Sequence, residues 1–275
     1  MLRCGPHALD LSRPRVMGIL NVTPDSFFDG GRFDDSERAL DHARRMVAEG
    51  AHLIDVGGES TRPGAEAVTA SAEAARVLPI VAALADEGVL VSIDTSKPEV
   101  MRDAVAAGAG MINDVRALRE AGALEAAAAT EAAVCLMHMR GTPRTMQSDT
   151  RYTDVVAEVC GFLIGRARAC EDAGIKRDRI AIDPGFGFAK DVDDNMKLLN
   201  GLHAFVETGF PIVAGLSRKS SLGRLTGRAA DDRVAASIAA MLAAVSRGAH
   251  IVRVHDVRET VDALAVWNAV NAADG

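Results

Sequence analysis

Three oxygen-bearing residues stand directly after short, mainly apolar runs of the sequence. They are Asp94, Asn113 and Asp183. Between one apolar run and the next, the sequence shows the spacing of a helix. Two carboxylates and a carboxamide, if brought together, can accept hydrogen bonds from the edge of a flat heterocycle that presents several N–H donors. Whether these side chains meet depends on the strands and helices that carry them. The hydrophobic periodicity of the chain predicts those strands and helices.

Roughly eight apolar segments alternate with helical patterns along the chain. The expected strands cover residues 16–20, 52–56, 89–93, 111–112, 133–138, 180–182, 211–216 and 250–254. The expected helices include Ala72–Ala85, a segment at about 118–130, and a last helix capped by Asp256. Strands that alternate with helices form a parallel sheet, and eight such units predict a closed (β/α)8 TIM barrel.

The barrel is expected to be a single domain over residues 1–275, with a short N-terminal cap over residues 1–15. An open, doubly wound sheet is the alternative fold. Such a sheet favours a Gly-rich loop after its first strand, and no G-x-G-x-x-G motif follows residues 16–20.

In such barrels the active site forms at the carboxyl ends of the strands. Lys219, Arg253 and His255 would supply cations there, beside the last two strands, where phosphate sites commonly lie. Asn21 could bind Mg²⁺ through its carboxamide oxygen, because Mg²⁺ typically keeps several waters and bridges substrate phosphates. The other side chains expected at this end are Thr61, Arg62, Met137, His138 and Ser217.

Composition excludes several functional classes. The net charge of −7 provides no broad basic surface for nucleic acid or for a membrane. No run of 18 apolar residues predicts a membrane span, and the first residues lack the apolar core of a signal peptide, so we expect a cytoplasmic protein. The four cysteines form no C-x-x-C pair, and Cys135, Cys160 and Cys170 are expected to be buried, reduced thiols.

Each candidate also has a purely structural interpretation. A lone Asp at a strand end often caps the next helix, and we expect this for Asp256. After Asp94, Thr95 or Ser96 could cap the helix instead, which leaves Asp94 available for the site. His138 could equally be a satisfied barrel residue. Phe186 and Phe188 could fill the core, although the alternating glycines around them favour a ring that lines a pocket.

The sequence resembles the dihydropteroate synthase family over nearly its whole length. The resemblance is carried by two long motifs, Met17–Phe27 (MGILNVTPDSF) and Asp55–Gly64 (DVGGESTRPG). It continues, in order, through Ile93–Ser96, Ile112–Asp114, Met137–Met139, Asp183–Phe188 (DPGFGF), Ser217–Ser220 (SRKS) and Arg253–Asp256 (RVHD). No motif position departs from the family pattern.

The resemblance implies that the chain condenses 6-hydroxymethyl-7,8-dihydropterin pyrophosphate with p-aminobenzoate, giving 7,8-dihydropteroate and pyrophosphate with Mg²⁺. The implied pterin site comprises Asp94, Asn113, Met137, Asp183, Lys219 and Arg253. Asn21, Arg253 and His255 would bind pyrophosphate, with the metal near Asn21. Thr61, Arg62, Pro63, Phe188 and Ser217 would form the p-aminobenzoate site, for which sulfonamides would compete.

Among these residues, the catalytic set is expected to be Arg62, Asp94, Lys219, Arg253 and His255. The family also implies a bacterial-type monofunctional enzyme and a homodimer. Two alternatives stay open at this point. One is a pterin-binding methyltransferase, which uses a similar barrel, and the other is a catalytically silent paralogue that binds pterin.

Overall fold

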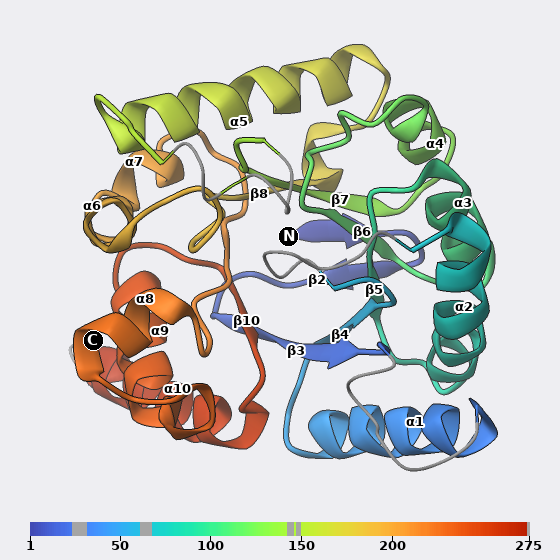
Figure 1. The fold of residues 1–275 in the computed structure, drawn as a ribbon, viewed down its shortest axis with the longest axis horizontal. Helices are drawn as coiled ribbons and strands as arrows, with labels where there is room; N and C mark the ends of the chain where they lie inside the picture. Colours follow the sequence, from blue (N-terminus) through green and yellow to red (C-terminus); the bar gives the residue numbers. More distant parts are fainter. Residues whose placement is uncertain (24–31, 61–67, 142–145, 147–149, 274–275) are drawn as a thin grey trace.

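The computed structural model describes residues 1–23, 32–60, 68–141, 146 and 150–273. Its main sheet has eight parallel strands in the order β8-β7-β6-β5-β4-β3-β10-β9. A parallel bridge between Ile182 and Ile212 joins the two edge strands and closes the ring. The predicted (β/α)8 TIM barrel is therefore confirmed (Figure 1). The strands are β3 (Arg15–Asn21), β4 (Leu53–Gly57), β5 (Val91–Asp94), β6 (Met111–Asp114), β7 (Ala133–Met137), β8 (Ile180–Asp183), β9 (Val213–Ala214) and β10 (Ile251–Val254).

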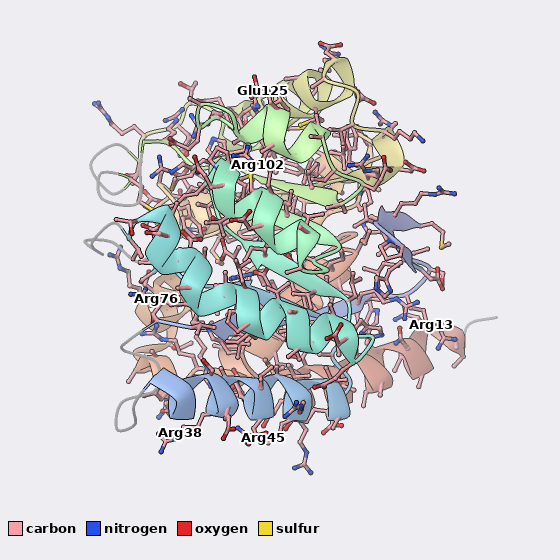
Figure 2. All side chains as sticks on the ribbon, turned by 90° about the vertical axis from the view of Figure 1, so that its right-hand side faces the viewer. Arg13, Arg38, Arg45, Arg76, Arg102 and Glu125 are labelled. Atoms are coloured by element: carbon pink, nitrogen blue, oxygen red, sulfur yellow. The ribbon has the colours of Figure 1, made fainter. Side chains whose placement is uncertain are left out.

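Helices surround the ring, and α1 to α4 pack side by side along one flank (Figure 2). Charged side chains such as Arg45, Arg102 and Glu125 lie on their outer surface. None of the described helices combines the length and the apolar composition that a membrane span requires. The helices are α1 (Arg32–Ala48), α2 (Ala70–Asp86), α3 (Pro98–Ala106), α4 (Ala123–Ala128), α5 (Val155–Asp172), α6 (Val192–Asn200), α7 (His203–Val206), α8 (Ser220–Thr226), α9 (Val234–Val245) and α10 (Val257–Ala272), with 3₁₀ turns at Arg177–Arg179 and Ala230–Asp232.

Alternation along the strands divides the barrel interior into two levels. The lower level is apolar and includes Leu53, Met111, Ala181 and Ile251. Because side chains two positions apart on a strand share a face, the next inward residues form a separate upper level. That level is mostly polar and comprises Asp55, Asp94, Asn113, Met137, Asp183 and Arg253. The apolar level thus supports a polar level at the carboxyl ends of the strands.

A hairpin closes the lower end of the barrel. Strands β1 (Leu2–Cys4) and β2 (His7–Leu9) pair antiparallel, and Leu2, Cys4 and Leu9 pack against the apolar level. Figure 1 shows the N-terminus in the middle of the ring. The sequence indicated a cap in this part of the chain but no strand pairing. The short runs at residues 2–4 and 7–9 carry little periodic signal.

The helix expected at about 118–130 is shorter than the sequence indicated, since α4 spans Ala123–Ala128. The cause lies in Asp114, whose Oδ1 accepts a hydrogen bond from Arg116 N–H and whose Oδ2 accepts one from Leu118 N–H. Ala117 and Leu118 adopt φ of 54° and 56°, in the left-handed region that a right-handed helix cannot use.

Two other expectations were wrong in detail. The seventh strand is only Val213–Ala214, not the whole of residues 211–216. Asp256 precedes α10 but makes no side-chain cap. Its carboxylate binds the Arg218 guanidinium instead, with Arg218 Nε 3.1 Å from Oδ2. A charged partner forms a stronger hydrogen bond than a backbone N–H.

All four cysteines are free thiols. Cys135 and Cys170 are buried as expected, whereas Cys160 is half-buried. Burial raises the pKa of Cys170 to about 11, so this thiol stays protonated and unreactive near neutral pH.

Candidate active site

A cavity that is open to solvent lies at the carboxyl ends of the strands. Most of the predicted site residues meet there, contributed by strands that lie far apart in the sequence. The lining consists of Asp94, Asn113, Val115, Met137, Asp183, Gly185, Phe186, Phe188, Gly215, Lys219 and Arg253.

Arg253 links three strands across one side of the cavity. Its Nε donates to Asp55 Oδ2 at 2.6 Å, and its Nη2 donates to Asp94 Oδ2 at 2.8 Å. Asn113 Nδ2 donates to the same Asp55 oxygen at 3.0 Å. Asp55 is 0% exposed, and both donors bind its Oδ2, while its Oδ1 has no hydrogen-bond partner among the described residues.

Asp55 contacts the site cation, although the sequence did not single it out. The sequence places Asp55 on a strand and in a family motif, but not in the candidate site. A signal was present, because a carboxylate in the middle of an apolar strand is almost never buried without a partner. The structure shows that this partner is the site cation Arg253.

Asp94 and Asp183 are the carboxylates of the cavity. Burial raises the pKa of both, although the Arg253 guanidinium opposes the rise at Asp94. At Asp183 the Gly185 N–H, which donates to Oδ1 at 2.7 Å, and the Lys219 ammonium oppose it. Burial outweighs these opposing groups and raises the pKa of Asp94 to about 7, so Asp94 can exchange a proton near neutral pH, whereas the cations and N–H groups limit the rise.

Lys219 stands opposite Asp183, with its Nζ 4.1 Å from the centre of the Phe188 ring. Burial and the neighbouring Arg253 charge together lower the pKa of the Lys219 ammonium to about 8, although Asp183 and Asp94 oppose the shift. Lys219 is therefore a donor whose charge changes just above neutral pH.

The loop after β8 is held by a second buried lysine that the sequence analysis did not single out. Lys190 Nζ donates to Gly185 O at 2.9 Å and to Phe188 O at 3.0 Å. It also lies 3.0 Å from His138 Nδ1. Burial and Lys190 lower the pKa of His138 to about 2, so the neutral ring serves structure, and it is not part of the cavity lining.

Apolar side chains form the remaining wall. Met137 is 4% exposed and packs with Val115 and Met139 in a separate apolar cluster above the barrel core. Phe186 and Phe188 both line the cavity, although Phe186 is also part of the main core. A flat ring inserted here would meet polar groups at its edge and apolar groups on its faces.

Ser217 and His255 form a pair at the tips of β9 and β10, outside the cavity lining. His255 N–H donates to Ser217 Oγ at 3.2 Å, and this oxygen lies 3.0 Å from His255 Nδ1. The hydroxyl can then donate to Nδ1, which favours the tautomer that carries its proton on Nε2. The sequence predicts a cation at His255, but this is wrong, because burial and Arg253 lower the pKa of His255 to about 4 and leave the ring neutral near pH 7.

Asn21 ends β3, half-buried, and is not part of the cavity lining. The other three predicted residues, Thr61, Arg62 and Pro63, lie outside the described residues. Within the described part of the chain, no three His, Cys, Asp or Glu side chains form a metal cluster. Independently of this, a carboxamide oxygen such as that of Asn21 is a ligand type that Mg²⁺ accepts, and Mg²⁺ typically keeps several water ligands.

Gly185→Ala is expected to destabilise the fold and distort the cavity. Gly185 has φ +71°, and an added Cβ would lie 2.0 Å from the His138 carbonyl oxygen. Strain and a backbone clash together should cost about 2–4 kcal/mol in the free energy of unfolding. Denaturant titration measures this loss. Gly161→Ala is the matched control, because that glycine lies in α5 with nothing within 4 Å of the added atom. Equal stability of the two variants would contradict the close approach.

Comparisons with known proteins agree with this geometry. Residues 17–255 match the family described as pterin binding enzyme. The dihydropteroate synthase of Escherichia coli (strain K12) is 51% identical over 267 residues, covering 97% of this chain and 95% of the relative. A structure of Xanthomonas albilineans dihydropteroate synthase with 4-aminobenzoic acid superposes with a TM-score of 0.91, at 56% identity over 96% of this chain and 95% of that one. A Yersinia pestis dihydropteroate synthase with a sulfonamide drug complex superposes at 0.92, with 48% identity over 96% of each chain.

Proposed function

Because the chain belongs to the dihydropteroate synthase family of pterin-binding enzymes, we propose how its strand-end site performs that reaction. The enzyme joins 6-hydroxymethyl-7,8-dihydropterin pyrophosphate to p-aminobenzoate in folate biosynthesis, and releases pyrophosphate. One observation supports the roles proposed below. Five polar side chains line the same cavity, namely Asp94, Asn113, Asp183, Lys219 and Arg253.

The pterin ring binds in the cavity. Asp183 and Asp94 accept hydrogen bonds from its N–H and amino groups, and Asn113 offers a carboxamide oxygen because its Nδ2 is held by Asp55. Lys219 donates to an acceptor on the ring. Met137 packs against one face of the pterin ring. The Arg253 guanidinium stacks on the pterin ring from the rim of the cavity.

The pyrophosphate lies at the rim, beside Arg253 and His255. Arg253 uses Nε and Nη2 for Asp55 and Asp94, so its fixed guanidinium presents its remaining N–H groups to the leaving group. His255 contributes a neutral Nε2–H donor. Asn21 would hold Mg²⁺ through its carboxamide oxygen, and the ion would neutralise further charge on the phosphates.

Bond breaking precedes or accompanies amine attack. The C–O bond to pyrophosphate breaks, and the electron-rich dihydropterin stabilises the cationic methylene that remains. The amine of p-aminobenzoate then forms the new C–N bond and loses a proton. The protein supplies preorganised charge rather than a nucleophile.

The p-aminobenzoate end is assigned to Phe188 and Ser217 among the described residues, together with Thr61, Arg62 and Pro63. Phe188 lines the cavity, and Ser217 lies next to the pyrophosphate donor His255. An arylamine held between them would reach the exocyclic carbon of the pterin. Sulfonamides, which resemble p-aminobenzoate in shape, would bind the same place.

The affinity for the pterin is expected to fall as the pH rises above 8. The pKa of Lys219 is about 8 in the free protein, so below this pH the ammonium is present and above it the donor is progressively lost. The sign follows from linkage: if the complex needs the bound proton, affinity drops by up to about tenfold for each further pH unit. Calorimetry with the unphosphorylated 6-hydroxymethyl-7,8-dihydropterin isolates the ring from phosphate titration. Lys219→Arg, charged throughout, should show a flat profile, and an equally flat wild-type profile would contradict the role.

A homodimer in the cytoplasm is the proposed state of the protein. On α10, Val266 and Val270 are 66% and 61% exposed, and their four-residue spacing places them on one helix face. Helix α9 packs directly beside α10. Light scattering of the purified chain should give twice 28.9 kDa. Val266→Lys with Val270→Lys should give the monomer mass, and a monomeric wild type would contradict the proposal.

A further inference from the structure

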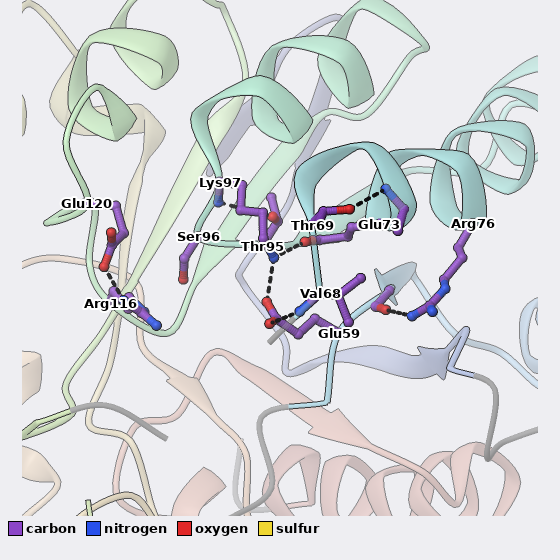
Figure 3. A network of polar contacts seen from close by, with 12 residues as sticks. Glu59, Val68, Thr69, Glu73, Arg76, Thr95, Ser96, Lys97, Arg116 and Glu120 are labelled. Atoms are coloured by element: carbon purple, nitrogen blue, oxygen red, sulfur yellow. Dashed lines mark hydrogen bonds and ion pairs between the residues drawn. The ribbon is translucent and has the colours of Figure 1, made fainter. Parts of the chain in front are cut away.

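A buried ion-pair cluster lies beside the active site but outside its cavity. Lys97 Nζ is 2.6 Å from Glu59 Oε2 and also binds Glu73 Oε2. The other oxygen of Glu59 accepts a hydrogen bond from Val68 N–H at 3.0 Å. Figure 3 shows these contacts between the ends of β4 and β5 and the start of α2.

The cluster is well enough buried to hold a fixed geometry. Glu73 is 0% exposed, and the side chains of Lys97 and Glu59 are 21% and 28% exposed. Burial alone would lower the pKa of Lys97, but its hydrogen bonds to Glu59 and Glu73 raise it above the ordinary value. Lys97 therefore remains an ammonium throughout the physiological pH range.

The backbone of Lys97 is tied to the floor of the active site. Lys97 lies three residues after Asp94, and its N–H donates to Thr95 Oγ1 at 3.2 Å. Thr95 N–H in turn donates to the carbonyl of Asn113 at 3.1 Å. The ammonium thus extends from a segment whose position is fixed by two residues of the pterin site.

Glu59 and Val68 flank the connection between β4 and α2, in which the sequence places Thr61 and Arg62. Glu59 lies at the start of this connection, and its side chain accepts a hydrogen bond from Val68 N–H at the end of it. This one residue therefore links the two ends. The start of the connection is also fixed at Gly58, whose carbonyl accepts a hydrogen bond from Arg76 Nη1 at 2.9 Å. Lys97 is the cation that holds this glutamate next to β5.

We propose that Lys97 is a positioning residue for the second substrate. Through Glu59 it holds the described residues on either side of the 60–67 connection, Glu59 and Val68, relative to Asp94. The proposed function assigns Thr61 and Arg62 of this connection to p-aminobenzoate. This inference rests on the proposed function of those two residues. A purely structural ion pair would instead act mainly through Glu73, which belongs to α2 and whose Oε2 binds Lys97, while its Oε1 has no hydrogen-bond partner among the described residues.

Steady-state kinetics of Lys97→Met, Glu59→Gln and Glu73→Gln separate these two roles. We expect Lys97→Met and Glu59→Gln to lower kcat/KM for p-aminobenzoate by about 10- to 100-fold, the effect of misplacing a group by roughly 1 Å. Their Kd for the dihydropterin should stay at the wild-type value. Glu73→Gln should lower Tm but keep kcat/KM close to wild type. Arg44→Met, which removes the Arg44–Glu87 pair on the outer helices, controls for the loss of an ion pair.

A double-variant cycle tests the route through Glu59. If Lys97 acts through that residue, adding Glu59→Gln to Lys97→Met causes no further loss of kcat/KM. Wild-type kinetics in both single variants would overturn the inference, as would a Glu73→Gln defect equal to that of Glu59→Gln. Arg62→Ala tests the premise separately, because it should lower turnover more than pterin binding. Normal turnover in Arg62→Ala would refute the proposed role of the connection itself, whatever Lys97 does.

Discussion

Asp183→Asn should weaken dihydropterin binding by about 100-fold, because the substitution conflicts with a fixed donor whichever way the amide turns. Asp183 is 5% exposed, and Gly185 N–H donates to its Oδ1 at 2.7 Å. If the asparagine keeps its oxygen on Gly185 N–H, its NH₂ group faces the N–H donors of the pterin. If it turns over, the NH₂ group faces Gly185 N–H instead.

Each orientation leaves one buried donor without an acceptor and removes a charge-assisted hydrogen bond. Together these effects cost about 2–4 kcal/mol, which corresponds to a loss of affinity of at least about 30-fold. Calorimetric titration with the dihydropterin measures the loss. Asp191→Asn is the matched control, since Asp191 caps α6 through Asp194 N–H and lies outside the cavity lining. Wild-type pterin affinity in a folded Asp183→Asn protein would exclude the proposed ring contact.

Arg253→Lys should lower kcat by about 100-fold or more while the protein still folds. The guanidinium fork spans Asp55 and Asp94, with N–O distances of 2.6 and 2.8 Å. A lysine keeps the positive charge but has a single nitrogen, which cannot occupy both positions and also face the leaving group. The loss should therefore be larger in turnover than in stability.

Arg253→Met is a less useful test, because it leaves the buried Asp55 carboxylate without its cation and should cost about 3–5 kcal/mol of stability. Arg218→Lys is the matched control for the lysine variant. Arg218 also uses Nε and Nη2, but both bind the single carboxylate of Asp256, and Arg218 does not line the cavity. Equal turnover in Arg253→Lys and Arg218→Lys would argue against transition-state stabilisation by Arg253.

The barrel and most of its cavity were predictable because they follow from short-range patterns. Period-two alternation places Asp94, Asn113 and Asp183 inward, and parallel strands bring their carboxyl ends together. The same rule applies to Arg253, two residues after the buried Ile251. Local periodicity therefore determined both the strands and the inward direction of these side chains.

Features that depend on long-range partners could not be read in the same way. Asp55 contacts Arg253 across 198 positions in the sequence, and Lys190 reaches His138 across 52. The neutral state of His255 follows from burial beside two arginines, which no local pattern reports. The shortened helix after β6 has the same origin, because Asp114 and the Arg166 side chain hold carbonyl and N–H groups of residues 116–118 in a non-helical loop.

The most direct test of the account is product formation by the purified chain. The protein would be mixed with 6-hydroxymethyl-7,8-dihydropterin pyrophosphate, p-aminobenzoate and Mg²⁺, and 7,8-dihydropteroate would be followed by chromatography. The account predicts product that requires the metal, that a sulfonamide suppresses, and that Arg253→Lys nearly eliminates. A folded sample that binds the dihydropterin but forms no dihydropteroate would contradict it.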